Sequence, residues 1–239
     1  MMRFSRVWIF QVLISLGLLT ATALTGISLV GLAGTAAAQD RRQNAPGEFD
    51  FYVLSLSWSP SYCEEAAERG NNGRSQQIQC GRPYSFVVHG LWPQYERGFP
   101  NYCQRPSPRL DRNIMTSMLD LMPAPGLIFA EWDKHGTCSG LSARAYFETT
   151  RKARAAVKIP PEYLDLAAEK TVAPAEIEEA FIKVNPGLSA SAISVVCGRK
   201  RLSEVRICMS KDLQFRACEE TDRRACRRDE VVMPPMRGT

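Results

Sequence analysis

The chain has 239 residues, of which 45% are hydrophobic and 23% are charged, with a formal net charge of +5 at pH 7. A chain of this size is typical of one domain with a substantial hydrophobic core. The charge is only mildly basic, so it permits binding to a polyanion but excludes any argument for such binding from charge alone.

Residues 1–38 have the pattern of a secretory signal peptide. A basic start without acidic residues, Met1–Trp8, precedes an apolar run to about Leu32 and the small residues Ala36–Ala38. This pattern predicts cleavage before Gln39 and export to the periplasm or the exterior. The apolar run is long for a signal peptide, so an uncleaved membrane anchor remains the alternative.

The segment 39–239 is predicted to form a single domain without internal repeats. Its eight cysteines are even in number and follow an export signal, which predicts four disulfides in an oxidising compartment. A zinc site is not expected, because the chain has no CxxC pair and only two histidines.

The first half of this segment contains two predicted strands. Phe49–Ser57 alternates apolar and small residues, and Ser85–His89 is a β-branched and aromatic run that would present His89 at its end. The polar, glycine-bearing stretch Glu64–Gln79 between them indicates a short helical turn and a loop.

Four helices are predicted next. Pro106–Leu121 has apolar residues at four-residue spacing, Leu127–His135 is a second helix, and Ser142 caps a third that runs to about Val157 with Tyr146 and Phe147 facing inward. Pro174 suits the start of a fourth, which Asn185-Pro186-Gly187 ends.

Two strands with a period of two residues follow, Ala192–Cys197 and Leu202–Cys208. The turn Gly198–Arg201 joins them into a hairpin. Together these elements predict an α+β fold, with an antiparallel sheet and helices segregated beside it.

The stretch FAEWDKHGTCSG contains His135, one of the two histidines. In a helix, Glu131 and His135 share a face, and a carboxylate beside an imidazole favours its protonated form and orients the ring. Lys134 points roughly 100° away around such a helix, but it could still reach an anionic substrate. Gly136 lets the chain leave the helix.

The other histidine, His89, offers a second imidazole in the stretch YSFVVHGLWPQY. Two histidines can supply a general base and a general acid, each contributing about 10²–10⁴ in rate. RNA carries its own nucleophile, the ribose 2′-hydroxyl, so no metal is needed. The pattern leaves other interpretations open: structural histidines, core tryptophans at positions 92 and 132, or a metal bound by His and Glu.

Two strings, FVVHGLWPQ (Phe86–Gln94) and EWDKHGTC (Glu131–Cys138), resemble the catalytic signatures of the ribonuclease T2 family of secreted endoribonucleases. LSLSWSPSYC (Leu54–Cys63) is similar to that family's first strand, and the last four cysteines fit its C-terminal pattern. The resemblance covers nearly all of 39–239. It implies cleavage of single-stranded RNA to 2′,3′-cyclic phosphates and then to 3′-phosphates, by a monomer without metal or cofactor.

The resemblance also implies residue roles. His135 corresponds to the general base, His89 to the general acid, and Glu131 with Lys134 to the pair that assists His135 and stabilises the transition state. Trp92 helps to hold the pocket. For substrate binding, it points to base stacking by Tyr95 and Phe99, which could equally be ordinary loop aromatics, and to a base pocket near Ser57.

One position departs from the family pattern. Ala130 stands where the second signature often has a histidine that assists phosphate binding, so we expect weaker binding or a lower rate, which Lys134 offsets. This departure leaves open a binding protein with a degenerate site. Two further alternatives are a metal-dependent phosphodiesterase and a membrane-tethered form of the same enzyme. The family also implies the disulfide pairing Cys63–Cys80, Cys103–Cys138, Cys197–Cys226 and Cys208–Cys218.

Overall fold

The computed structural model describes residues 43–70, 78–219 and 225–236. The predicted export segment, residues 1–38, lies outside these ranges. None of the described helices is long and apolar enough to cross a membrane.

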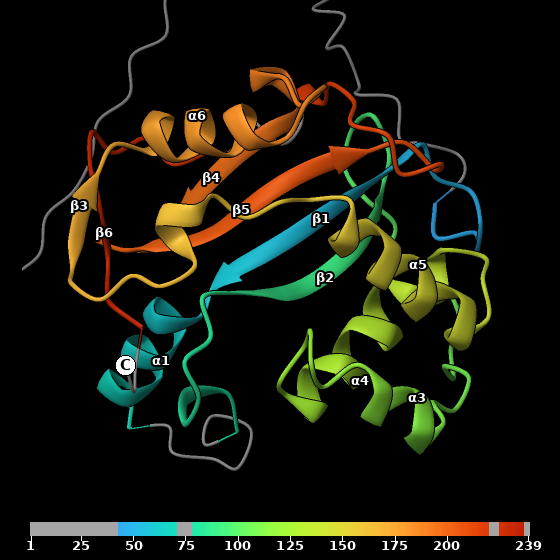
Figure 1. Ribbon diagram of the computed structural model, residues 1–239. Coiled ribbons are helices and arrows are strands. Elements are labelled where there is room, and N and C mark those ends of the chain that lie inside the picture. Colours follow the sequence, from blue (N-terminus) through green and yellow to red (C-terminus); the bar gives the residue numbers. More distant parts are fainter. Residues whose placement is uncertain (1–42, 71–77, 220–224, 237–239) are drawn as a thin grey trace, which may run out of the picture. The chain divides into compact units, whose positions relative to one another are not determined.

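A four-stranded antiparallel sheet with the strand order β2-β1-β5-β4 forms the centre of the fold (Figure 1). The strands are β1 (Phe51–Trp58), β2 (Phe86–Gln94), β4 (Ile193–Cys197) and β5 (Leu202–Met209). The last two form the predicted hairpin, and the class is α+β as predicted. A second sheet of only two strands, β3 (Lys170–Val172) and β6 (Val231–Met233), was not predicted, because three-residue strands carry no readable period.

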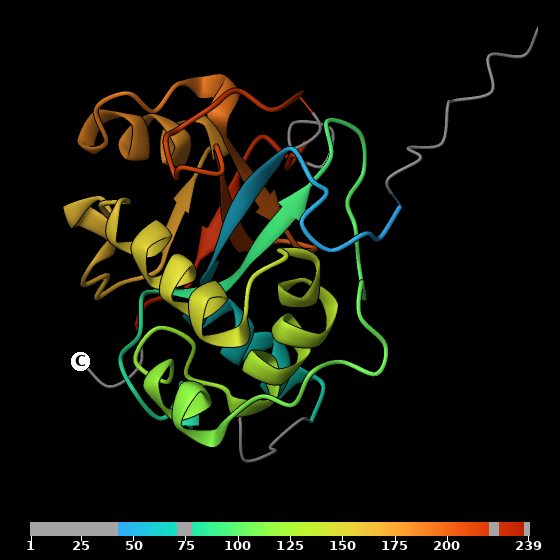
Figure 2. The same ribbon diagram turned by 90° about the vertical axis from the view of Figure 1, so that its right-hand side faces the viewer.

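Among the described residues, the sheet is accompanied by the helices α1 (Ser59–Glu68), α3 (Arg112–Ser117), α4 (Pro125–Lys134), α5 (Ala143–Ala155) and α6 (Pro174–Val184). Figures 1 and 2 show α3, α4 and α5 grouped beside β2, while α6 lies beside β4. The edge of the sheet at β2 is therefore the place where strand and helix residues from the two histidine strings meet.

Local sequence explains where most helices begin and end. Ser142 caps α5 by accepting a hydrogen bond from the Ala145 amide, as predicted, and α6 begins at Pro174. The predicted helix Pro106–Leu121 is only α3, six residues long. Its start is delayed to Arg112, because prolines at 106 and 108 disfavour helix before it. Asp111 is the N-cap, and its side chain accepts a hydrogen bond from the Asn113 amide.

One face of the sheet forms the hydrophobic core. Leu54 and Leu56 of β1 are fully buried there, together with Leu91 of β2 and Ile207 of β5. Alternate residues point to the opposite face. That second face carries polar and charged side chains, including Ser55, and it provides one wall of the site described below.

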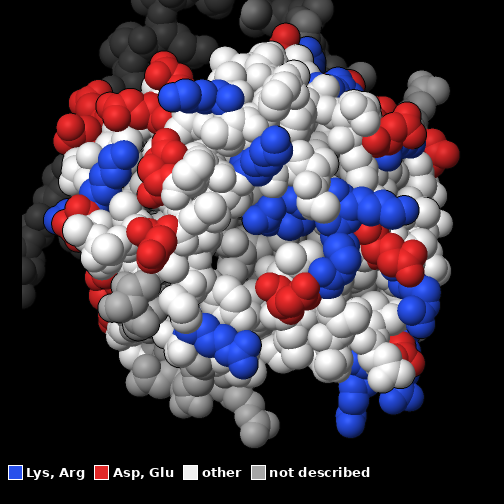
Figure 3. Space-filling view, in the orientation of Figure 1, with Lys and Arg blue, Asp and Glu red and all other residues white. Residues whose placement is uncertain are grey.

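The described cysteines form four disulfides, Cys63–Cys80, Cys103–Cys138, Cys197–Cys226 and Cys208–Cys218. This is the pairing that the resemblance implies. Acidic and basic side chains both occur on the face shown in Figure 3, with uncharged areas between them. This face therefore does not attract a polyanion through charge of a single sign.

Candidate active site

A β-bulge places His89 on the second face of the sheet. Ser55 of β1 pairs with Gly90 of β2, while the next residue, Leu56, pairs with Val88. His89 is therefore the extra residue, without a partner on β1. Bulges bend a strand and redirect side chains near functional sites. The strand continues past His89 to Gln94, so the prediction that His89 ends its strand is wrong.

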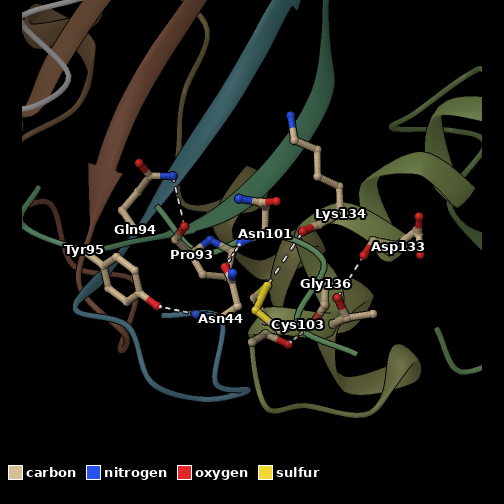
Figure 4. Close-up of a disulfide and its surroundings, with 12 residues drawn as sticks. Asn44, Pro93, Gln94, Tyr95, Asn101, Cys103, Asp133, Lys134 and Gly136 are labelled. Atoms are coloured by element: carbon tan, nitrogen blue, oxygen red, sulfur yellow. Dashed lines mark hydrogen bonds between the residues drawn. A yellow bond between two sulfur atoms is a disulfide. The ribbon is translucent and has the colours of Figure 1, made fainter. Parts of the chain in front are cut away.

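The C-terminal end of α4 brings the second string to the same place. His135 is the C-cap of α4, and the 3₁₀ turn Gly136–Cys138 follows directly. The disulfide Cys103–Cys138 ties this turn to the preceding loop, and the Tyr102 amide donates to the Lys134 carbonyl at 2.8 Å. Figure 4 shows the Lys134 side chain pointing away from the disulfide. The covalent link and the hydrogen bond fix the backbone on which His135 stands.

The two strings enclose a cavity of about 250 Å³. The four residues with predicted catalytic roles all line it, and so do two of the four with predicted substrate contacts, Trp92 and Phe99. Its complete lining is Val53, His89, Trp92, Gln94, Phe99, Glu131, Lys134, His135, Glu204 and Arg206.

Trp92 lies between the two imidazoles. Its ring centroid is 5.4 Å from that of His89 in an edge arrangement and 5.3 Å from that of His135 in a stacked one. Its indole nitrogen donates a hydrogen bond of 2.6 Å to Glu131. A side chain with these three contacts fixes the rings relative to each other and to the carboxylate.

Gly90 makes this approach possible. A Cβ atom at this position would lie 2.0 Å from Glu131 Oε2 and 2.4 Å from Trp92 Nε1. Any side chain would therefore displace both groups. The role of this glycine was not predicted from the sequence, although its place directly after His89 was a visible signal.

His135 is nearly inaccessible, with an exposed fraction of 4%. Its Nδ1 has no hydrogen-bond partner among the described residues. Burial lowers the pKa of His135 to about 3, and the charges of Lys134 and His89 act in the same direction. This imidazole is therefore neutral over the physiological range.

The predicted pairing of Glu131 with His135 is wrong. Glu131 turns toward Trp92 and His89, with its Oε1 3.7 Å from His89 Nε2. The reason is that His135 stands at the end of the helix, where its ring stacks on Trp92 instead of lying over the preceding turn. Among the described residues, the charges that act on the pKa of His135 are those of Lys134 and His89, and both lower it.

His89 has the opposite environment. Its Nδ1 lies 2.5 Å from Glu204 Oε1. Burial acts to lower the pKa of His89, but the hydrogen bond and the charge of Glu204, with the charge of Glu131, outweigh it, so that the pKa is raised above 6.5. This imidazole is therefore charged at acidic pH.

The two carboxyl groups beside His89 also differ. Burial raises the pKa of Glu131 to about 7, although the His89 charge and the Trp92 hydrogen bond act against it. Burial acts to raise the pKa of Glu204 as well, but His89 and Arg206 lower it to about 2. Near pH 5, Glu204 is therefore ionised and Glu131 holds a proton.

Three other predicted positions lie away from the cavity lining. Tyr95 is buried in the core at 4% exposure, and its hydroxyl accepts a hydrogen bond from the Asn44 amide, so its predicted stacking role is wrong. Ser57 pairs with Glu204 across β1 and β5 and is only partly exposed. Ala130 is exposed on α4 and borders a separate depression that also includes Phe129 and Arg109.

Glu204 and Arg206 were missed by the sequence analysis. They alternate along β5, on the face that carries the cavity, and both line it. Two opposite charges two residues apart in a largely apolar strand were the available signal. Among the described residues, no group of three or more His, Cys, Asp or Glu side chains is arranged to hold a metal ion.

Comparison with known proteins now identifies the family. The sequence profile of the Ribonuclease T2 family matches residues 49–218, a range that includes both histidine strings and β5. The chain belongs to the ribonuclease T2 family. The resemblance of the two short strings is thereby extended to most of the fold.

Individual members of the ribonuclease T2 family match to different extents. The chain is 46% identical to a ribonuclease of Aeromonas hydrophila over 103 residues, which cover 43% of each chain, so it spans less than half of that relative. It is 27% identical to ribonuclease I of Escherichia coli over 230 residues, which cover 80% of this chain and 85% of the relative. The structure of RNase NT in complex with 5′-AMP has a TM-score of 0.57 and 24% identity, over 79% of this chain and 100% of that one, and shows the shared fold.

Proposed function

We propose that this protein is a metal-independent endoribonuclease that cleaves single-stranded RNA by transphosphorylation. The observation that carries the proposal is the pair of imidazoles in one cavity whose pKa values are shifted in opposite directions. A neutral imidazole and a charged one, available at the same pH, are what concerted general base and general acid catalysis requires.

In the first step, neutral His135 takes the proton of the ribose 2′-hydroxyl, and the 2′-oxygen attacks the adjacent phosphorus. Protonated His89 gives a proton to the 5′-oxygen as the bond between phosphorus and that oxygen breaks. The products are a 2′,3′-cyclic phosphate and a free 5′-hydroxyl. A phosphodiester anion next to His135 favours its protonated form, so binding of the substrate strengthens the base.

Lys134 stabilises the negative charge that develops on the phosphoryl oxygens. Its side chain lines the same cavity as both imidazoles, so its positive charge is available to the phosphoryl group. In the second step the roles reverse: His89 activates a water molecule, His135 protonates the 2′-oxygen, and a 3′-phosphate results. DNA lacks the 2′-hydroxyl and does not react.

The cavity admits a splayed nucleotide rather than a duplex. Trp92 and Phe99 offer aromatic surfaces for a base, and each stacked base contributes about 1–3 kcal/mol to binding. The relative RNase NT has been solved in complex with 5′-AMP, which supports nucleotide binding in this fold.

The segment 1–38 is proposed to direct export and to be removed, leaving the single domain 39–239 as a secreted or periplasmic monomer. Four disulfides support an oxidising compartment.

The test is cleavage of a short single-stranded RNA in EDTA by purified residues 39–239, with the product ends read by mass spectrometry. A matched RNA with one 2′-deoxynucleotide at the scissile position is the control substrate, and His135→Ala is the control protein. We expect cyclic-phosphate ends from the parent on RNA alone. A folded, disulfide-bonded parent that does not cleave would favour a binding protein, and activity that EDTA abolishes would favour a metal-dependent phosphodiesterase.

A further inference from the structure

Glu204 makes the shortest polar contact of His89. Its Oε1 is 2.5 Å from His89 Nδ1, whereas the nearest approach of Glu131 is 3.7 Å, to Nε2 on the other side of the ring. Glu204 is buried, with an exposed fraction of 8%. An Nδ1–H that donates to a carboxylate sets the tautomer of an imidazole, which leaves Nε2 as the nitrogen that exchanges a proton.

Arg206 holds the carboxylate of Glu204 in place. Its Nε and Nη2 donate to Glu204 Oε2 at 2.9 and 2.7 Å, so each carboxylate oxygen has its own partner. The two donors of a guanidinium have a fixed spacing, and this fork therefore opposes rotation of the carboxylate.

The sheet itself creates the contact between His89 and Glu204. His89 lies on β2 and Glu204 on β5, with β1 between them, so their backbones are about 10 Å apart. The bulge redirects His89. On the same face of the sheet, β1 presents only the short side chains of Ser55 and Ser57 between His89 and Glu204. Side chains of β2 and β5 can meet across β1 only where the side chains of β1 are short enough to leave room above it.

Resting on the proposed function, we infer that Glu204 is a positioning residue, which holds His89 through Nδ1 and directs Nε2 to the departing 5′-oxygen. In the cleavage step the proton leaves Nε2 for that oxygen as its bond to phosphorus breaks, and the neutral ring keeps Nδ1–H on Glu204. Arg206 keeps Glu204 oriented throughout. This role is distinct from the family roles carried by Glu131 and Lys134.

The other charged groups around His89 do not fill this role. From α4, Glu131 is farther away and holds a proton at acidic pH because burial raises its pKa to about 7. Lys134 and Arg206 are cations, and His135 is neutral because burial lowers its pKa to about 3. The ionised group at hydrogen-bond distance from His89 is Glu204.

The first arm of the test compares two RNA substrates that differ in the leaving atom. A substrate with sulfur in place of the bridging 5′-oxygen does not need a general acid, because a thiolate leaves unprotonated. For Glu204→Gln we expect kcat on normal RNA to fall by about 10²-fold with little change in KM. On the sulfur substrate we expect a rate close to that of the parent.

The second arm measures the pKa of His89 directly by NMR. The chain has two histidines, so the loss of one set of imidazole signals in His135→Ala assigns the other set to His89. We expect Glu204→Gln to lower the pKa of His89 by about 1–3 units, because the opposite charge is removed. The matched control is Glu64→Gln, which removes a carboxylate 2.8 Å from Arg201 outside the cavity, and should leave both readouts unchanged.

Each outcome decides the inference. If Glu204 were purely structural, Glu204→Gln would reduce stability, lower the cleavage rate of both substrates equally and leave the pKa of His89 unchanged. Equal loss of rate on both substrates, or an unchanged pKa of His89, would each overturn the inference. If Glu204→Gln does not fold, Glu204→Asp replaces it, because this variant keeps the charge that pairs with Arg206 but shortens the reach to His89. Its rates on the normal and the sulfur-containing substrate are then compared in the same way. If the parent itself forms no cyclic ends, the proposed function fails, while the NMR arm still shows whether Glu204 holds His89.

Discussion

The two imidazoles of this protein occupy opposite environments within one cavity. His89 stands on a strand between two carboxyl groups, and Glu204 keeps its charged form stable. His135 stands at a helix end and is buried, and the charges that act on its pKa are those of Lys134 and His89. In the proposed mechanism, these surroundings suit one imidazole to act as an acid and the other to act as a base. The proposal therefore depends on the difference between the two surroundings more than on the presence of two histidines.

The largest effect is expected from removing either imidazole. His89→Ala and His135→Ala should each lower kcat by about 10²–10⁴-fold, because each removes one partner of the proton transfer. The sulfur-containing substrate distinguishes them: it should restore the rate of His89→Ala and leave His135→Ala slow. Equal behaviour of the two variants on that substrate would mean that the acid and base roles are not divided in this way.

Gly90→Ala should disturb the positions of both imidazoles, His89 and His135, at once. The added Cβ would overlap Glu131 Oε2 and Trp92 Nε1, so the indole that separates the two rings must move. Misplacement of such groups by about 1 Å costs about 10²-fold in rate. Gly126→Ala, an exposed position in α4, is the matched control and should keep full activity. Unchanged kinetics for Gly90→Ala would show that the Trp92 contacts do not set the geometry.

The disulfide behind His135 should affect activity as well as stability. Replacing Cys103 and Cys138 by serine should lower the free energy of unfolding by about 2–4 kcal/mol, as should the same change at Cys197 and Cys226. Only the first pair anchors the turn that carries His135. Rates measured on protein that remains folded should therefore fall for the first variant alone, and equal losses would remove the functional distinction between them.

The opposite pKa shifts also predict opposite pH dependence of stability. Burial raises the pKa of Glu131 from 4.5 to about 7, so between pH 4.5 and 6.5 the folded state holds a proton that the unfolded chain releases, and stability rises as pH falls. His135, whose pKa burial lowers from 6.5 to about 3, has the reverse effect. Between pH 4.5 and 6.5 these two contributions oppose each other in the parent.

Single substitutions should expose each contribution. On acidification from pH 6.5 to 4.5, Glu131→Gln should lose stability and His135→Asn should gain it, each by up to about 1.4 kcal/mol per pH unit relative to the parent. Denaturant titrations at several pH values measure these slopes. Slopes of the same sign in both variants would contradict the assigned environments.

The smallest effect is expected at Ala130. A histidine there should raise cleavage at acidic pH by no more than about fivefold, corresponding to the 1 kcal/mol that an exposed charge contributes. The position is exposed on α4 and outside the cavity lining. Steady-state kinetics on the same RNA measure the change, and a loss of activity would count against phosphate assistance from this position.

Much of this arrangement could be predicted from short stretches of sequence. The period of two in β4 and β5, the cap at Ser142 and the proline that begins α6 are local signals, and their elements were found where expected. The catalytic candidates were found because each signature is continuous in sequence. Pro106 and Pro108 act locally in the same way on α3, and their effect exceeds that of the apolar spacing, which predicts an earlier start.

What could not be predicted depends on strand order. Glu204 reaches His89 only because β1 lies between β2 and β5, and no local pattern encodes that neighbourhood. The lowered pKa of His135 results from burial, which is a property of the packed protein. Helical spacing alone therefore predicted the wrong partner for Glu131.

The most direct test of the division between acid and base is an NMR titration of both histidines in the parent protein, with His135→Ala used for assignment. The account predicts that His89 titrates above 6.5 and that His135 remains neutral until well below pH 5. Two histidines that both titrate near 6.5, or in the reverse order, would contradict it.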